Sequence, residues 1–372
     1  MAGQGQIEFV SAGGHVLPFA ARPVPLLHPW LRLIMFPRTR PLSAISTTPE
    51  LRATRAGEAS TTNNPPPASN CSPTQRSLRD STASLASSIY EYRTIHGRAY
   101  QSSNTTEYWA PKDAKHLEGN DVAHHYTLML MNNKLYGPPL KDPKKILDVG
   151  TGTGIWAIDM ADEFPSAEVI GTDISAVQPS WVPPNCSFQI DDAQLDWTFD
   201  EGVFDFVHMR NLFGGISDWP KLYRQAFEAL KPGGWIQSVE IDLETRSENP
   251  RVANDPDHVY KTWCRVFWAA GDKTGRTFKI ARDGQMQKYI EEAGFVDAYH
   301  QMWKVPIGGW ARDTLLKRVG QYNGLYIDLS LDGFAVFPLA QVLGWTLDEV
   351  DELVAKMRKQ LEDPKSLPYY NL

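Results

Sequence analysis

A short run of glycines after an apolar segment constrains the fold of this chain more than any other feature. Residues 145–149 have the pattern of a short apolar strand, residues 155–163 have that of a helix, and Gly150, Gly152 and Gly154 lie between them. Glycine lets the backbone turn sharply and lets a ligand lie against the main chain without a Cβ clash. The helix that follows presents free backbone N–H groups. The segment therefore predicts a strand–turn–helix unit that faces a ligand.

The pattern of strand and helix continues beyond this turn. Three apolar segments typical of strands follow: 168–172, 187–190 and 204–208. A helix at 219–230, closed by the turn Lys231-Pro-Gly-Gly234, then leads into a further strand at 235–239. A helix at 286–293 and closing strands within 296–305 come next. Near-continuous apolar strands that alternate with helices indicate a parallel sheet covered on both faces. The sequence therefore predicts an α/β fold.

The chain divides into regions of different composition. We expect an N-terminal extension at 1–85, a helical cap at 86–143 with helices at 85–100 and 122–136, a ligand-binding core at 144–310 with a helical insertion at about 245–282, and C-terminal helices at 311–372, namely 315–325 and 348–361. The extension is rich in arginine and serine and poor in acidic residues, and this composition is typical of disorder and also of mitochondrial transit peptides.

Composition excludes several functions. The net charge of -7 argues against a protein held to nucleic acid by its own positive charge. The three cysteines lack metal-type or redox-type spacing, so we expect the protein in a reducing compartment. We expect a cytoplasmic location, with the nucleus and, because of the N-terminal composition, the mitochondrion as alternatives. No apolar run long enough to span a membrane and no set of metal ligands with recognisable spacing is found in the sequence.

Acidic residues stand at the ends of the predicted strands, where open parallel sheets bind their ligands. Asp173 ends the second strand and is placed to accept hydrogen bonds from both ribose hydroxyls. Ile174 beside it can pack on adenine, and Asp192 after the third strand is placed to accept from the adenine amino group. Dinucleotide folds use a similar glycine pattern, but here the third glycine comes one residue early. This spacing argues against an NAD-dependent oxidoreductase, which we keep only as a second alternative to the functions given below.

Four segments, 147–157, 171–175, 204–210 and 230–236, resemble class I S-adenosylmethionine methyltransferases. More narrowly, the segments 90–100 and 121–126 are similar to the cap of the fungal LaeA-like group. The resemblance implies a Rossmann-like, mostly parallel, seven-stranded sheet with an N-terminal helical cap and a helical insertion. It also implies S-adenosylmethionine as the cofactor, with Asp173 at the ribose, Asp192 at the adenine, and the following residues along the methionine portion: Asp148, Gly150, Gly152, Gly154, Arg210 and Asn211.

Methyl transfer from a sulfonium requires mainly that the nucleophile be aligned, and an oxygen or nitrogen nucleophile can also need a base. His208 and Glu240, at the ends of the fourth and fifth strands, are the candidate bases. Aromatic and imidazole side chains of the cap and insertion are candidates for a substrate pocket: Tyr100, Trp109, His125, Trp263 and Trp268.

Two functions remain open at this point. The first is a methyltransferase that modifies an oxygen or nitrogen of a small-molecule secondary metabolite. The second is a LaeA-like regulator of secondary-metabolite gene expression that acts through protein partners. We expect a small-molecule acceptor, no direct contact with nucleic acid and no membrane.

Overall fold

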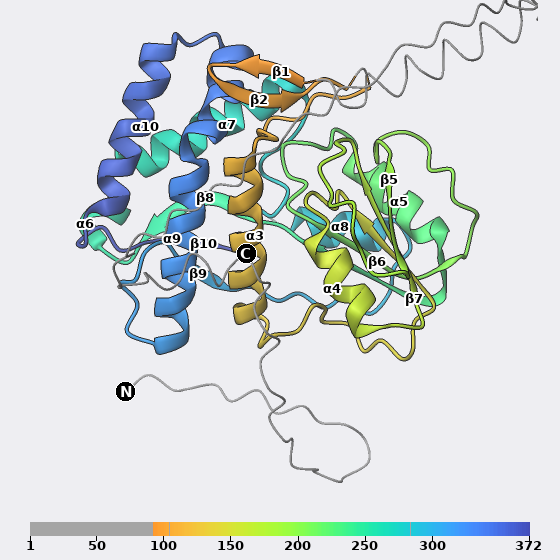
Figure 1. Cartoon of the computed structure of the whole chain (residues 1–372). Helices are drawn as coiled ribbons and strands as arrows, with labels where there is room; N and C mark the ends of the chain where they lie inside the picture. The colour runs from red at the N-terminus through yellow and green to blue at the C-terminus, as the bar shows by residue number, and fades with distance from the viewer. Residues whose placement is uncertain (1–91, 104, 283) are drawn as a thin grey trace, which may run out of the picture. The chain divides into compact units, whose positions relative to one another are not determined.

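The computed structural model describes residues 92–103, 105–282 and 284–372 (Figure 1). The predicted extension at 1–85 and the first residues of the predicted helix at 85–100 lie outside the described residues.

A parallel sheet of five strands forms the centre of the fold. Its strands are β3 (Lys145–Val149), β4 (Glu168–Asp173), β5 (Cys186–Ile190), β6 (Phe204–Arg210) and β7 (Leu230–Val239). They lie in the order β5-β4-β3-β6-β7, and every neighbouring pair is parallel. The order reverses between β3 and β6, so a crevice forms beyond the carboxyl ends of these two strands, where such sheets bind ligands.

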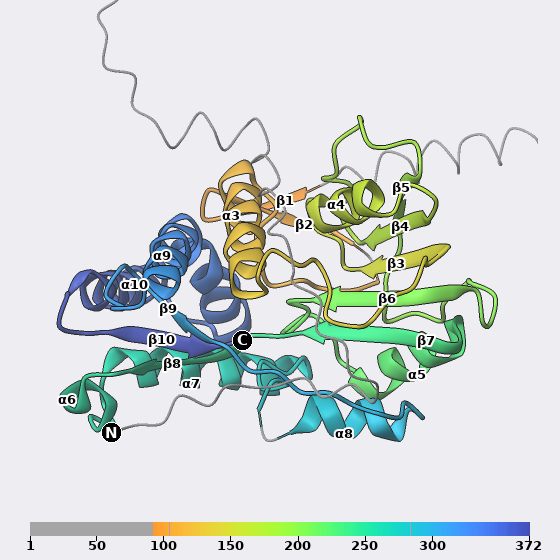
Figure 2. The same ribbon diagram turned by 90° about the horizontal axis from the view of Figure 1, so that it is seen from below.

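Helices cover both faces of this sheet, as the sequence predicts (Figure 2). On one face lies α4 (Ile155–Glu163), whose Trp156 and Met160 are buried in a cluster with side chains of β3, β4 and β6. The other face is covered by α5 (Trp219–Ala229), which in turn packs against α8 (Gln285–Glu292). The α/β class and the positions of these helices are therefore confirmed.

The predicted count of seven strands in the core sheet is wrong for the described residues. The remaining strands β8 (Asp242–Ser247), β9 (Lys304–Pro306) and β10 (Pro368–Asn371) form a separate antiparallel sheet in the order β8-β10-β9. Because β10, at the carboxyl end of the chain, pairs with both neighbours, β9 is held away from the core sheet. The rest of the predicted closing segment, 296–303, has no strand.

The Lys231–Gly234 segment also differs from its prediction as a turn. It lies within β7 as an irregularity, since Phe204 pairs with Leu230 whereas Phe206 already pairs with Trp235. The extra residues loop out, and Lys231 reaches Asp205 at 2.9 Å.

The insertion is less helical than the prediction for 245–282. It begins within β8, which alternates in burial and pairs with β10, so this part is a strand. Two helices follow, α6 (Pro250–Ala253) and α7 (Val259–Thr274).

In its described residues, 92–103 and 105–143, the cap has one helix and a hairpin instead of two helices. The hairpin strands are β1 (Tyr92–Ile95) and β2 (Arg98–Gln101), and the turn residues His96 and Gly97 have φ of 48° and 72°. Positive φ at both central residues is the geometry of a tight hairpin turn and ends any helix. This part of the predicted helix at 85–100 is therefore wrong.

The second predicted cap helix is confirmed with different ends. It is α3 (Ala114–Leu130), which begins at Asp113, whose side chain accepts from the backbone N–H of His116. It stops before 136 because Asn132 and Asn133 have φ of 56° and 60°.

The C-terminal helices are α9 (Thr314–Ala335), the π-helical segment η1 (Val336–Leu343) and α10 (Leu347–Glu362). Residues 314–343 are long and apolar enough to cross a membrane by length and composition alone, and half of the apolar window is buried. Here α9 runs alongside α3 and packs against it (Figures 1 and 2). Burial against α3 accounts for the apolar character of this helix in the described fold.

Candidate active site

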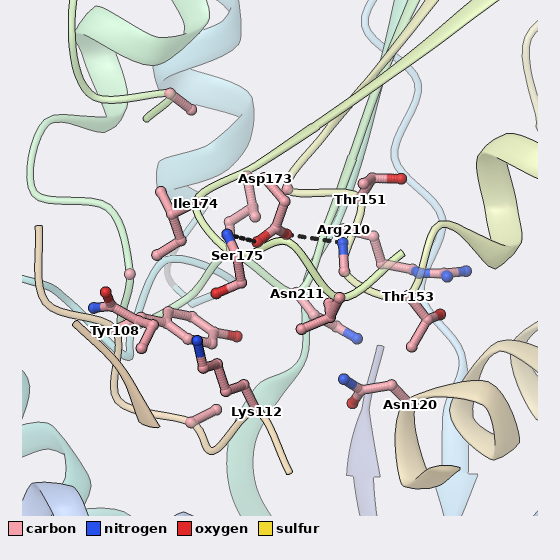
Figure 3. A pocket seen from close by; sticks show the side chains of 18 of the residues that line it. Tyr108, Lys112, Asn120, Thr151, Thr153, Asp173, Ile174, Ser175, Arg210 and Asn211 are labelled. Carbon is pink, nitrogen blue, oxygen red and sulfur yellow. Dashed lines mark hydrogen bonds between the residues drawn. The ribbon is translucent and has the colours of Figure 1, made fainter. Parts of the chain in front are cut away.

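A cavity of about 180 Å³ lies between the carboxyl ends of the core strands and the cap (Figure 3). Its polar side comes from the strand ends and the loops that follow: Asp148, Gly150, Gly152, Asp173, Ile174, Asp192, His208, Arg210 and Asn211. Its apolar side comes from the cap, α9 and the loop after β6, and includes Tyr108, Trp109, Phe213, Tyr326 and Phe334. The cavity thus brings together eight of the nine predicted cofactor residues.

The three glycines of the turn have positive φ but different surroundings. At Gly150 a Cβ would lie 2.4 Å from Leu212, and at Gly154 it would lie 2.3 Å from Phe188. At Gly152, which lines the cavity, a Cβ would meet nothing within 4 Å. Gly152 therefore leaves open space for a ligand against the backbone. Gly154 does not line the cavity, because its open face is filled by Phe188, so its predicted contact with the cofactor is replaced by a packing role.

Asp173 ends β4 and connects the glycine turn with the next loop. Its Oδ2 accepts from the backbone N–H of Gly152 at 2.8 Å, and its Oδ1 accepts from that of Ser175 at 2.8 Å (Figure 3). Burial raises the pKa of the Asp173 carboxyl to about 6, although these hydrogen bonds act in the opposite direction. The carboxyl group both fixes the turn and faces the cavity.

Two side chains on the polar side keep a buried oxygen without a partner. Oδ1 of Asp192 accepts from the backbone N–H of Gln194 at 3.1 Å, whereas its Oδ2 has no hydrogen-bond partner among the described residues. Asn211, held at a φ of 57°, has a buried Oδ1 that is also unpaired among them. Unpaired buried acceptors are costly, so both atoms indicate a ligand that supplies donors.

His208 is held at the floor of the cavity by β3 and α4. Its Nδ1 lies 2.7 Å from Oδ1 of Asp148, and its ring stacks on Trp156 with centroids 3.7 Å apart. The second oxygen of Asp148 accepts from the Thr151 hydroxyl at 2.6 Å. Burial lowers the pKa of His208, so the ring is neutral and donates from Nδ1 to the carboxylate.

Arg210 is half-buried beside this pair and contacts the cap helix. Its Nη2 lies 3.2 Å from Nδ1 of His124, and Nε2 of His124 lies 2.9 Å from Oδ2 of Asp159. Because a guanidinium only donates, Nδ1 of His124 is the acceptor and Nε2 carries the proton. Burial lowers the pKa of His124, in agreement with this neutral form.

Glu240 does not line the cavity, so its predicted role as a base is wrong. Its two carboxyl oxygens accept from the backbone N–H groups of Leu212 and Phe213, at 2.9 and 3.0 Å. Burial raises its pKa to about 8. The side chain instead fixes the loop that carries Asn211.

Of the predicted substrate-pocket residues, only Trp109 lines the cavity. Its indole N–H donates to the carbonyl of Phe213 at 2.9 Å. The other four do not line it. Tyr100 donates to the carbonyl of Gly333, His125 packs edge-on against Tyr322, and Trp268 lies under Arg282. Trp263 lines a neighbouring apolar cavity of about 50 Å³, which shares Trp109 and Tyr326 among its lining residues with the first. Position along α3 or α7 alone does not say which face of the helix turns inward, which explains His125, Trp263 and Trp268. Tyr100 lies on the hairpin strand β2 and not on the predicted helix.

Sequence reasoning missed several residues of the cap side, among them His116, Asn120, Tyr326 and Phe334. The signal for the first two was present, because His116, Asn120 and Ala123 are spaced by three and four residues along α3 and share one face. Nothing in the sequence links that face to α9.

The residues on the polar side fit S-adenosylmethionine. The adenine amino group of the cofactor would supply a donor for the unpaired oxygen of Asp192. Its amino-acid end would supply an ammonium donor for Asn211 and a carboxylate for Arg210. Bound there, the cofactor supplies a methyl group on a positively charged sulfur, which needs no further activation. The parallel sheet and this site define the class of S-adenosylmethionine-dependent methyltransferases.

Comparison with known proteins agrees with this class. Residues 122–299 match the model of a family described as "Methyltransferase domain". The chain is 37% identical to the methyltransferase pytC of Aspergillus terreus over 75% of this chain and 86% of that protein. It is 34% identical to the secondary metabolism regulator LAE1 of Cochliobolus heterostrophus over 74% and 91%, and 30% identical to the regulator laeA of Aspergillus fumigatus over 79% and 78%. The chain belongs to this LaeA-like family of class I methyltransferases.

Proposed function

We propose that this methyltransferase modifies an oxygen or nitrogen of a small-molecule secondary metabolite. The observation that carries the proposal is the composition of the cavity. Its apolar side is lined by Tyr108, Trp109, Phe213, Tyr326 and Phe334, and such a lining suits an apolar, ring-containing ligand. The relative named as a methyltransferase, pytC, also has the higher identity, 37% against 34% and 30% for the two regulators.

In this proposal each side of the cavity has one task. Asp173, Asp192, Asn211 and Arg210 hold the cofactor through charge and hydrogen bonds, while the glycine turn lets it lie against the backbone. The aromatic cap excludes water and orients the acceptor, which is the main contribution a protein makes to a direct displacement. His208 supports the site by fixing Asp148.

The second candidate function is regulation of secondary-metabolite gene expression through protein partners. The similarity to LAE1 and laeA favours it. Cofactor binding is common to both functions and does not separate them.

Deletion of the gene in its host with metabolite profiling tests the proposal. We expect one compound to disappear and its desmethyl precursor to accumulate, with the transcripts of unrelated pathways unchanged. Restoring the wild-type gene should recover the compound, and restoring an Asp173→Ala gene should not. Loss of many unrelated compounds together with their transcripts would support the regulator and contradict the proposal.

A further inference from the structure

His116 is a buried polar group on the apolar side of the cavity. It lies in the first turn of α3, is only 4% exposed, and lines the cavity. Its Nδ1 is buried and has no hydrogen-bond partner among the described residues. An unpaired ring nitrogen in such surroundings is costly, so a native site that keeps one is expected to receive a partner from a ligand.

The surroundings of His116 indicate what kind of ligand that is. Its ring meets Phe334 edge-on at 5.7 Å, and Phe334 lies 5.4 Å from Trp109. The one polar atom of the Trp109 ring already donates to Phe213, so this ring offers the cavity only apolar surface. Phe334 and Trp109 therefore form an aromatic wall of the cavity beside the His116 imidazole.

Two other polar side chains on this side of the cavity, Gln101 and Thr106, are already engaged within the protein. The Gln101 amide donates to the carbonyl of Thr106 at 3.1 Å, and the Thr106 hydroxyl receives the amide of Gln194 at 2.6 Å. His116 differs from both in having a free nitrogen. Burial lowers its pKa to about 4, so the ring is neutral at physiological pH and offers a lone pair.

We propose that His116 anchors the acceptor by accepting a hydrogen bond from its hydroxyl group, and that the acceptor is a hydroxylated aromatic molecule. This inference rests on the proposed function, because it concerns the acceptor side of the same cavity. The aromatic wall holds the rings, and the imidazole fixes the orientation of the hydroxyl. The site should therefore bind aromatic molecules with a hydroxyl group more tightly than their methyl ethers, which cannot donate a hydrogen bond.

A pair of probes tests this directly. Naphthalen-2-ol carries a hydroxyl donor, and 2-methoxynaphthalene has nearly the same apolar surface without one. Affinities are measured by calorimetry on the full chain loaded with S-adenosylhomocysteine. We expect the wild type to bind the naphthol about tenfold more tightly than the ether, the ratio typical of one buried hydrogen bond.

The decisive variant is His116→Phe, which keeps a ring against Phe334 but removes both nitrogens. It should weaken the naphthol about tenfold and leave the ether and S-adenosylhomocysteine unchanged. His125→Phe is the matched control, because His125 lies on the same helix, also has an unpaired nitrogen, and does not line the cavity. This control should bind both probes as the wild type does.

The inference is overturned if the wild type binds neither probe, or if His116→Phe leaves the naphthol unchanged or weakens both probes alike. Should His116→Phe fail to fold, the ring nitrogen signals of His116 in ¹⁵N-histidine-labelled wild type decide instead. They should shift on adding the naphthol and not on adding the ether, and an absence of that difference overturns the inference. If the wild type does not bind S-adenosylhomocysteine at all, the failure lies with the proposed function itself.

Discussion

Nη2 of Arg210, at the end of a core strand, donates to Nδ1 of His124 on the cap helix at a distance of 3.2 Å. This contact joins the polar side of the cavity to the cap. It also fixes the proton of His124 on the nitrogen that faces Asp159, 2.9 Å away. The cap therefore positions a residue on the polar side of the cavity as well as covering the cavity.

Replacing His124 with Phe should weaken the cofactor site. The substitution leaves a donor of the half-buried Arg210 guanidinium without its partner, which costs about 1 kcal/mol of unfolding free energy. The guanidinium also loses its fixed position, so S-adenosylmethionine affinity should fall about tenfold by calorimetry. Asp159→Asn is the control, because the Asp159 side chain is 37% exposed and should cost much less in both measurements. Equal effects of the two variants would contradict this role of His124.

Comparing Gly152→Ala with Gly202→Ala should show whether ligand contact or backbone strain determines the effect of Gly152 on cofactor binding. Gly152 and Gly202 have φ of 59° and 65°, and a Cβ at either would meet nothing within 4 Å. Both Ala variants should therefore lose about 1–2 kcal/mol of stability in urea unfolding. Only Gly152 lines the cavity, so only its variant should bind S-adenosylmethionine more weakly, by about tenfold or more. If Gly202→Ala weakened binding as much, backbone strain and not contact would be the cause.

Stability should decrease as pH rises from about 5 to about 8. Burial raises the pKa of Glu240 from 4.5 to about 8 and that of Asp173 from 3.8 to about 6. Between the unfolded and folded values the unfolded chain has released the proton while the folded chain retains it. Unfolding is therefore favoured by rising pH, by a few kcal/mol at most for Glu240.

The variant Glu240→Gln isolates the contribution of Glu240. Its unfolding free energy, measured by urea at several pH values, should depend less on pH above 6 than that of the wild type. An unchanged slope would show that Glu240 does not titrate in this range.

His208 should act by holding Asp148 and not as an obligatory base. His208→Asn can still donate to Asp148, whereas His208→Phe keeps only the stacking on Trp156. We expect His208→Asn to retain S-adenosylmethionine affinity within about threefold and His208→Phe to lose about tenfold. Methyl transfer that is abolished in both variants, with affinity retained in both, would instead identify His208 as the base.

The core of the fold could be predicted because its signals are local. The strand 145–149, the helix 155–163 and the glycine turn between them have the predicted bounds, since each depends on its own residues and near neighbours. The strand ends then place Asp173 and Asp192 at one edge by topology. The cap and the closing strands depend instead on distant partners. β10 pairs with β8 and β9, which lie far earlier in the chain, and such distant pairing leaves no local signal.

In the site, too, some residues could be predicted from local sequence and others depend on distant packing. Trp109 was predicted from composition, but Tyr326 and Phe334 enter the cavity only because α9 packs against α3. Glu240 was expected to face the ligand because it follows a strand, yet a backbone N–H pair captures its carboxyl group. Position at a strand end narrows the candidates for a site, and only the packing of the next loop decides among them.

Transfer of a labelled methyl group tests the central claim most directly. Purified protein is incubated with S-adenosylmethionine labelled in its methyl group and with a small-molecule extract of the host that lacks the gene. We expect the label in one extractable small molecule, in the wild-type reaction, and at least about tenfold less with Asp173→Ala, which loses the hydrogen bonds that fix the glycine turn. Label found only in precipitated protein, or in no product at all, would contradict a small-molecule methyltransferase.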